Sequence, residues 1–160
     1  MTLNIAPCIW FDSDAEEAAH FYVGIFKNSR IVDTAYYPEN EYKPAGSVMQ
    51  IEVELDGQPF TLLNGGPGHE HSDAISFEVR CADQAEVDEY WDRLTADGGQ
   101  EVACGWLKDR YGVSWQVTPR GVYDVLNGPD KAAVQRAFDA MMTMKKIDLA
   151  ALEAAAASTP

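Results

Sequence analysis

The order of predicted elements constrains the fold of this chain more than any other feature, because one pattern occurs twice. A strand-like apolar run over residues 4–11 leads through a helix-capping cluster, Asp-Ser-Asp at residues 12–14, into a helical pattern over residues 15–26. Apolar side chains recur in this pattern at spacings of three and four positions, which is typical of one buried helical face. The first unit is completed by three extended runs, at residues 29–37, 46–55 and 59–63.

The second copy follows a glycine-rich break at residues 64–72, which is predicted to be a linker. A strand pattern over residues 73–80, with Ile75 directed toward the core, precedes a helix that begins after the capping residue Asp83. The second unit is completed by three predicted strands, at residues 101–103, 105–108 and 113–118.

The two copies predict an α+β fold made of two tandem βαβββ modules, at about residues 1–66 and 73–119. The pattern then becomes helical, and residues 120–160 are predicted to form a C-terminal helical extension with helices at residues 131–144 and 149–157. The first of these helices has a methionine-rich face, which predicts packing against apolar neighbours.

The charge and cysteine content disfavour several classes of function. Asp and Glu number 26 against 12 Lys and Arg, and the formal net charge of −14 disfavours binding to nucleic acids or to anionic membrane surfaces. No apolar run is long enough to span a membrane, and no secretion signal is recognised. Cys8, Cys81 and Cys104 are an odd number without C-x-x-C spacing, which favours free thiols and a cytoplasmic location.

Residues 104–119 predict a β-hairpin whose two faces differ. The polar turn, Asp-Arg-Tyr-Gly at residues 109–112, ends in a glycine where a positive φ is expected. In the second arm, Trp115 and its apolar neighbours two positions away alternate with Ser114 and Gln116. One face is therefore core and the other carries small uncharged polar groups. That polar face is either the wall of a pocket or a half-exposed sheet surface, and the alternation alone leaves both interpretations open.

Several stretches of the sequence resemble one known family. They are P-C-I-W-F-D (residues 7–12), A-I-S-F-E-V-R-C (74–81), E-V-D-E-Y-W-D-R-L (86–94), C-G-W-L-K-D-R-Y-G-V-S-W-Q-V (104–117) and A-M-M-T-M-K-K-I-D (140–148). They resemble the PhnB-like branch of the glyoxalase/bleomycin-resistance/dioxygenase (vicinal oxygen chelate) superfamily, whose members often carry the label demethylubiquinone 3-methyltransferase. The resemblance implies a homodimer in which curved sheets enclose a cavity for a small-molecule ligand.

The resemblance also indicates where metal ligands would stand. Metal-dependent members take His, His and Glu from their first, fifth and last strands, and the matching positions in this sequence are Ile5, Ala74 and Gln116. Two apolar side chains and a neutral amide are poor ligands for a divalent cation. We therefore expect no metal at these positions and no other cofactor.

Two functions remain open for such a protein. As a binding protein it would hold a small, partly aromatic or apolar molecule in a cavity. The residues predicted to line that cavity are Gln50, Ser76, Trp106, Ser114 and Gln116. As a metal-independent enzyme, acting for example on a quinone-like substrate, it would use Glu52 or Glu78 as a buried general base. Cys104 is a third catalytic candidate, as a nucleophile, although the sequence places no histidine close to it.

Overall fold

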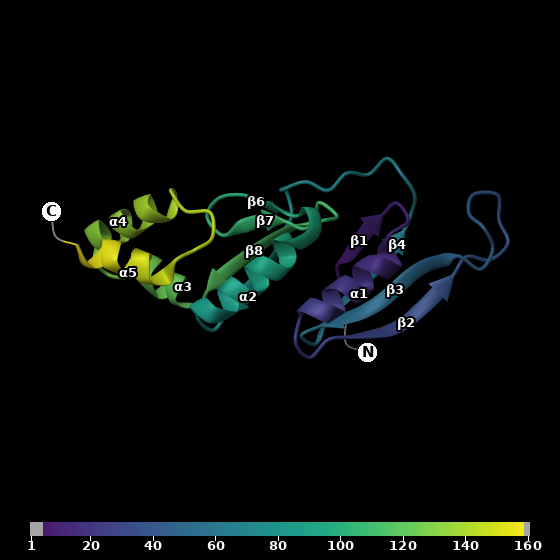
Figure 1. The fold of residues 1–160 in the computed structure, drawn as a ribbon, viewed down its shortest axis with the longest axis horizontal. Coiled ribbons are helices and arrows are strands. Elements are labelled where there is room, and N and C mark those ends of the chain that lie inside the picture. Colours follow the sequence, from purple (N-terminus) through teal and green to yellow (C-terminus); the bar gives the residue numbers. More distant parts are fainter. Residues whose placement is uncertain (1–4, 159–160) are drawn as a thin grey trace. The chain divides into compact units, whose positions relative to one another are not determined.

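The computed structural model describes residues 5–158, and the contacts within the chain divide it into two units. The first unit comprises Met1–Glu70 and the second His71–Pro160. Each unit contains one four-stranded sheet, and in each the helix that follows the first strand lies across one face of that sheet (Figure 1). None of the helices in the described part of the chain is both long enough and apolar enough to cross a membrane.

The first unit has the predicted β-α-β-β-β order. Its elements are β1 (Cys8–Phe11), α1 (Ala15–Ile25), β2 (Arg30–Tyr36), β3 (Val48–Leu55) and β4 (Gln58–Asn64). The strands are arranged β1-β4-β3-β2, with β1 parallel to β4 and the other neighbours antiparallel. Asp56 and Gly57 both have a positive φ in the turn between β3 and β4, which is the conformation that an Asp-Gly hairpin turn requires.

The core of the first unit lies between α1 and the sheet. Tyr22 of α1 and Ile51 of β3 are almost fully buried there. The start of α1 differs from the prediction, because Asp14 makes no side-chain capping bond. Asn64, at the end of β4, takes that role through its Oδ1, which accepts a hydrogen bond from the backbone N–H of Ala15 at 2.8 Å. The cap of this helix is therefore supplied from about fifty residues away, beyond the reach of any local sequence signal.

The second unit repeats the topology of the first. Its elements are β5 (Phe77–Cys81), α2 (Gln84–Thr95), the 3₁₀ turn η1 (Ala96–Gly98), β6 (Gln100–Glu101), β7 (Trp106–Lys108) and β8 (Ser114–Pro119). The strand order β5-β8-β7-β6, with β5 parallel to β8, corresponds to β1-β4-β3-β2 position by position. The prediction of an α+β fold made of two tandem βαβββ modules is confirmed.

The core of the second unit confirms the predicted alternation in the hairpin. Trp115 of β8 is 2% exposed and lies on the face that α2 covers, where Trp91 and Leu94 are buried. Asp83 caps α2 as predicted, since its side chain accepts a hydrogen bond from the N–H of Glu86. Trp115 and the residues two positions away from it therefore form the sheet side of this core.

The predicted starts of two strands are wrong. β1 begins at Cys8 rather than at residue 4, and β5 begins at Phe77 rather than at residue 73. Ile5 and Ile75 are consequently 79% and 70% exposed, and Ile75 does not lie in the core. The reason at β5 is that residues 73–75 form a turn and bend, so the alternation cannot extend into them. Asn4, the first residue of the predicted strand, lies outside the described residues.

Up to residue 158, where the described part ends, the C-terminal extension contains three helices, and it belongs to the second unit. They are α3 (Gly121–Leu126), α4 (Lys131–Met141) and α5 (Leu149–Ala157). Val122, Ile147 and Leu152 form a buried cluster, against which Met141 and Met144 pack. The predicted methionine-rich packing face is only partly buried, because Phe138 and Met142 on it are 44% and 54% exposed. The first predicted helix of the extension ends at Met141, three residues earlier than the sequence indicated.

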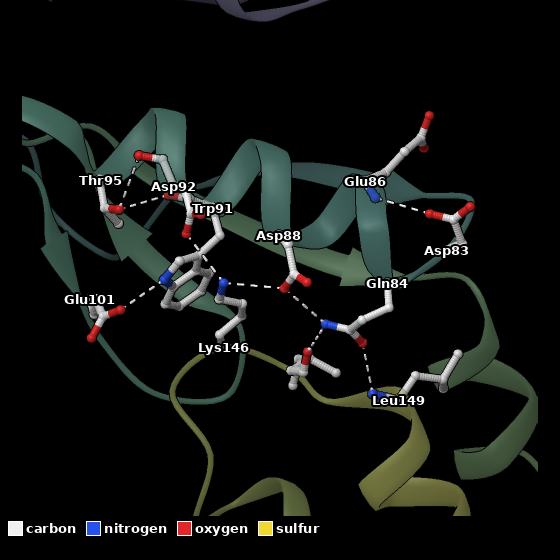
Figure 2. A network of polar contacts seen from close by, with 11 residues as sticks. Asp83, Gln84, Glu86, Asp88, Trp91, Asp92, Thr95, Glu101, Lys146 and Leu149 are labelled. Atoms are coloured by element: carbon white, nitrogen blue, oxygen red, sulfur yellow. Dashed lines mark hydrogen bonds and ion pairs between the residues drawn. The ribbon is translucent and has the colours of Figure 1, made fainter.

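A network of polar contacts attaches the extension to α2 (Figure 2). The Gln84 amide Nε2 donates to the carbonyl of Ile147 at 2.9 Å, and its Oε1 accepts from the N–H of Leu149 at 3.0 Å. Lys146 Nζ lies 3.2 Å from a carboxylate oxygen of both Asp88 and Asp92. The segment that leads into α5 is therefore held by three side chains of one helix.

Acid is expected to loosen this attachment. The hydrogen bond from Gln84 and the ion pair with Lys146 hold the pKa of Asp88 below its ordinary value of 3.8, and the hydrogen bond from Trp91 lowers the pKa of Glu101 in the same way. A carboxylate with a lowered pKa contributes stability that is present above its ordinary pKa and is lost as the pH falls through the folded-state pKa. Amide hydrogen exchange should therefore show faster exchange in α5 at about pH 3 than at about pH 6, after correction for intrinsic rates.

A variant with Lys146→Met provides the control for this prediction, because it removes one of the two partners that lower the pKa of Asp88. Its exchange in α5 should be faster than in the parent at about pH 6 and should depend less on acid. Equal acid sensitivity in the two proteins would contradict the assignment.

Candidate functional site

The polar face of the second sheet brings together most of the predicted ligand-binding residues. Gln116 of β8 lies opposite Glu78 of β5 on one side and opposite Trp106 of β7 on the other. The three side chains form a row across three strands, with neighbouring strands about 4.8 Å apart. This face is the reverse of the one that buries Trp115 under α2. The register predicted for the hairpin is thus the one observed.

Ser76 and Ser114 are placed by hydrogen bonds on this polar face. Gln116 Nε2 donates to Ser76 Oγ at 2.9 Å. Ser114 is only 2% exposed, and its hydroxyl donates to Asp73 Oδ1 at 2.7 Å. Lys108 Nζ lies 3.2 Å from the same oxygen, and the pKa of Asp73 is lowered by the Ser114 hydrogen bond first and by Lys108 second. Ser114 therefore orients Asp73.

Glu78 is bound by two neighbours at the other end of this face. Its Oε2 accepts from Arg80 Nε at 2.9 Å, and its Oε1 accepts from the hydroxyl of Tyr123. The guanidinium carbon of Arg80 lies 5.7 Å from the centre of the Tyr123 ring. Sequence reasoning missed both partners. Arg80 could have been found, because it follows Glu78 by two positions in a strand, but Tyr123 lies in α3 and no sequence signal connects it to the sheet.

The polar face of the first sheet carries two more of the predicted residues. Gln50 and Glu52 lie two positions apart on β3, opposite Leu63 and Thr61 of β4. Glu52 is exposed and lines a shallow hollow of about 260 Å³. A carboxylate that acts as a general base is usually shielded from water, and Glu52 is not shielded in this chain.

Comparison with known proteins agrees with this geometry. The family model described as 3-demethylubiquinone-9 3-methyltransferase matches residues 3–118. The chain belongs to this family. The PhnB protein from Bacillus cereus is 32% identical, with a TM-score of 0.66, over 73% of this chain and 99% of that one. The resemblance to the PhnB-like branch of the glyoxalase/bleomycin-resistance superfamily is confirmed.

More distant structures show the same fold. Protein PA1353 from Pseudomonas aeruginosa is 18% identical with a TM-score of 0.61, and the match covers 74% of this chain and 98% of that one. The fosfomycin resistance protein FosX from Listeria monocytogenes, complexed with Mn(II) and sulfate, is 17% identical with a TM-score of 0.52, over 79% of this chain and 98% of that one. No curated protein matches the sequence. The family match ends at residue 118, so α3, α4 and α5 lie beyond it.

The positions that match the metal ligands of the superfamily do not fit a metal in this family member. Ile5 and Ala74 are exposed and apolar. They precede β1 and β5, the strands that would have to point them toward a shared metal. The third position, Gln116, uses its amide nitrogen to bond Ser76. Among the described residues, no group of three or more His, Cys, Asp and Glu side chains is arranged to hold a metal ion.

Protein purified without chelator is accordingly expected to contain no stoichiometric transition metal at Ile5, Ala74 and Gln116, because none of the three offers a charged or imidazole ligand. Elemental analysis by plasma mass spectrometry measures this directly. One tightly held metal per chain that is lost in Gln116→Ala would contradict the prediction.

Cys104 lies away from the polar face. It has a φ of 56° in the turn that precedes β7. Its thiol Sγ lies 3.6 Å from the carbonyl of Met141 and 3.7 Å from Met142 Sδ, both in the extension. Its backbone N–H bonds the carbonyl of Met144 at 2.8 Å. Through these contacts Cys104 packs the segment between β6 and β7 against the extension. None of these partners is a general base that could activate the thiol as a nucleophile.

Proposed function

We propose that this protein binds a small, planar organic molecule on the polar face of its second sheet. The observation that carries the proposal is the row Glu78–Gln116–Trp106, which α2 leaves uncovered because it packs on the other side. Fixed polar groups beside an aromatic surface are typical of ligand sites, and the same fold occurs in the fosfomycin resistance protein FosX, whose structure is complexed with Mn(II) and sulfate.

The hydrogen-bonding groups in this row support a ligand with its own polar edge. Within residues 5–158, the Gln116 amide oxygen accepts no hydrogen bond, and the indole N–H of Trp106 donates none. Both residues are half-buried. An acceptor and a donor on adjacent strands match a planar molecule with a donor and an acceptor, such as a carbonyl- or hydroxyl-bearing ring, while the indole ring offers a stacking surface.

Binding without turnover is the form of this proposal that the contacts favour. Glu78 is half-buried beside Gln116, as a general base would have to be, but both of its oxygens already accept hydrogen bonds. Glu52 is exposed. The methyl transfer in the family description has no support in the strand order, because a nucleotide-type cofactor crevice is built from alternating parallel strands and helices. We include no cofactor in the proposal.

A thermal-shift screen of small aromatic and quinone-like metabolites tests the proposal. Compounds that raise the melting temperature of the parent should lose most of that effect in Gln116→Ala and in Trp106→Ala, because both remove groups from the row. The matched control is Gln135→Ala, which removes an exposed glutamine of α4 bonded only to Asp139. Compounds that raise the melting temperature equally in all variants would bind away from this row, and that result would overturn the proposal.

Homodimer formation is the second part of the proposal. Each sheet ends in edge strands whose backbone groups have no further strand partner in the described chain. Val32 and Tyr36, both on the edge strand β2, are 47% and 57% exposed, and a second copy would cover such apolar surface.

Analytical ultracentrifugation at micromolar concentration should therefore give about twice the chain mass of 17.6 kDa. A mass of one chain that does not change on concentration would refute the dimer.

A cytoplasmic location stays a prediction from the number and spacing of the three cysteines.

A further inference from the structure

The polar face of the second sheet ends in a cluster to which the C-terminal extension contributes. Glu78 and Arg80 both project from β5 onto this face, since they are two positions apart in one strand. Tyr123 of α3 donates its hydroxyl to Glu78 and places its ring beside the Arg80 guanidinium. Tyr123 lies beyond residue 118, where the family match ends. The contribution of Tyr123 to this cluster therefore lies outside the family match.

Within the cluster, Arg80 is the group that remains able to bind a ligand. The Glu78 side chain is 23% exposed and each of its oxygens already accepts a bond. The Arg80 side chain is 64% exposed and uses only Nε. Within residues 5–158 its two terminal nitrogens have no hydrogen-bond partner, which leaves a planar pair of donors on a side chain whose direction is fixed at Nε.

The position of Arg80 relies on the same register as the binding row. Arg80 lies opposite Thr118, two residues along β8 from Gln116. Two residues along a strand span about 7 Å. If the ring of a bound molecule contacts Gln116 and Trp106, the Arg80 guanidinium belongs to the next row of side chains along the same face. A guanidinium fork binds a carboxylate through two parallel hydrogen bonds, which a neutral amide or alcohol cannot reproduce.

We propose that Arg80, oriented by Glu78 and Tyr123, binds the carboxylate of an aromatic acid whose ring lies over Gln116 and Trp106. This inference rests on the proposed function and names the chemical class of its ligand. The net charge of −14 would otherwise repel such an anion, but a contact cation outweighs distant charges at physiological ionic strength because those charges are screened. Tyr123 is a positioning residue in this arrangement: it acts on the ligand only through Glu78 and Arg80.

Benzoate and its uncharged isostere benzamide are the probes, and isothermal titration calorimetry measures both with the full chain. The parent is expected to bind benzoate about tenfold more tightly than benzamide, as one charge-assisted bidentate contact allows. Arg80→Gln should abolish this preference and leave benzamide binding unchanged. The control Arg93→Gln removes an arginine of α2 that pairs with Glu89, so it makes the same change in net charge and should keep the preference.

Tyr123→Phe tests the positioning role, because it removes the hydroxyl that bonds Glu78 and keeps the ring beside Arg80. It should reduce benzoate affinity about threefold and leave benzamide affinity unchanged. A merely structural role of Tyr123 would not change the ratio of the two affinities. If Tyr123→Phe leaves the benzoate-to-benzamide ratio at the parental value, Tyr123 has no positioning role.

Failure of this inference is distinguishable from failure of the proposed function. Equal affinity for the two probes, no measurable binding of benzoate, or a preference that survives Arg80→Gln would each overturn the carboxylate assignment. The proposed function is judged separately, by whether the hits of the thermal-shift screen depend on Gln116 and Trp106. Neutral hits with that dependence, together with no preference for benzoate, would retain the binding site and reject only the aromatic acid.

Discussion

Trp115→Ala is expected to lower the free energy of unfolding by roughly 3–5 kcal/mol, the usual cost of emptying a buried aromatic site. Trp115 is 2% exposed. Its ring lies 5.3 Å from that of Phe77, and its indole N–H donates to Asp109 Oδ2 at 2.8 Å. The substitution removes the ring from the core beneath α2 and leaves that carboxylate oxygen without one of its donors. Urea denaturation of the parent and the variant, followed by far-ultraviolet circular dichroism, measures the difference.

Gln116→Ala is the neighbouring control, because adjacent strand residues face opposite ways. Its amide bonds only the half-buried Ser76, so the free energy of unfolding should change by less than about 1 kcal/mol. Ligand affinity, in contrast, should fall. The opposite result, with Gln116→Ala unfolding the protein and Trp115→Ala tolerated, would show that the register of this hairpin is shifted by one residue.

Asp109→Ala is expected to lower the free energy of unfolding by roughly 3 kcal/mol or more, because it leaves several buried donors without an acceptor. Asp109 is 2% exposed. Its Oδ1 accepts from the backbone N–H groups of Tyr111 and Val113 at 2.9 and 3.1 Å, and its Oδ2 accepts from the Trp115 indole. One side chain thus joins the turn of the β7–β8 hairpin to the core.

Asp109→Asn distinguishes the bonds that Asp109 accepts from the turn from the bond that it accepts from the Trp115 indole. The asparagine keeps one acceptor oxygen for the backbone N–H groups but presents an amide NH₂ where the indole needs an acceptor. The variant should therefore lose less stability than Asp109→Ala, and most of its loss should disappear in a Trp115→Phe background, where the indole N–H is absent. Urea denaturation of the four proteins of that cycle gives the coupling directly, and additive losses would show that Asp109 acts on the turn alone.

The β7–β8 hairpin was predicted from the sequence, but the contribution of the Asp109 carboxylate to stability was not. The Asp-Arg-Tyr-Gly turn and the period-two alternation after it are local patterns, and they placed Gly112 at a positive φ of 81° and Trp115 in the core. That Asp109 folds back onto Trp115 depends on side-chain directions in three dimensions, which no periodicity encodes.

The candidate site shows the same division. Gln116, Trp106 and Glu78 were predicted to share one face, because alternation along each strand and the repeated β-α-β-β-β order place them there. Arg80, the ionic partner of Glu78, is two positions away in the same strand, whereas the contact of Glu78 with Tyr123 depends on where α3 lies in the folded chain. The distinction matters for function, because the contacts of Glu78 are what argue against its use as a general base.

The tandem order of elements, the polarity of the sheet faces and the family can all be recognised in the amino-acid sequence alone. These features are local: a period of two or of 3.6, a turn pair or a short motif is complete within a few residues. Three other contacts become visible only in the folded chain: Asn64 caps α1, Cys104 packs against the extension, and Tyr123 donates to Glu78. Each of these contacts joins residues 37 to 49 positions apart, and their pairing depends on chain packing that a single sequence does not display.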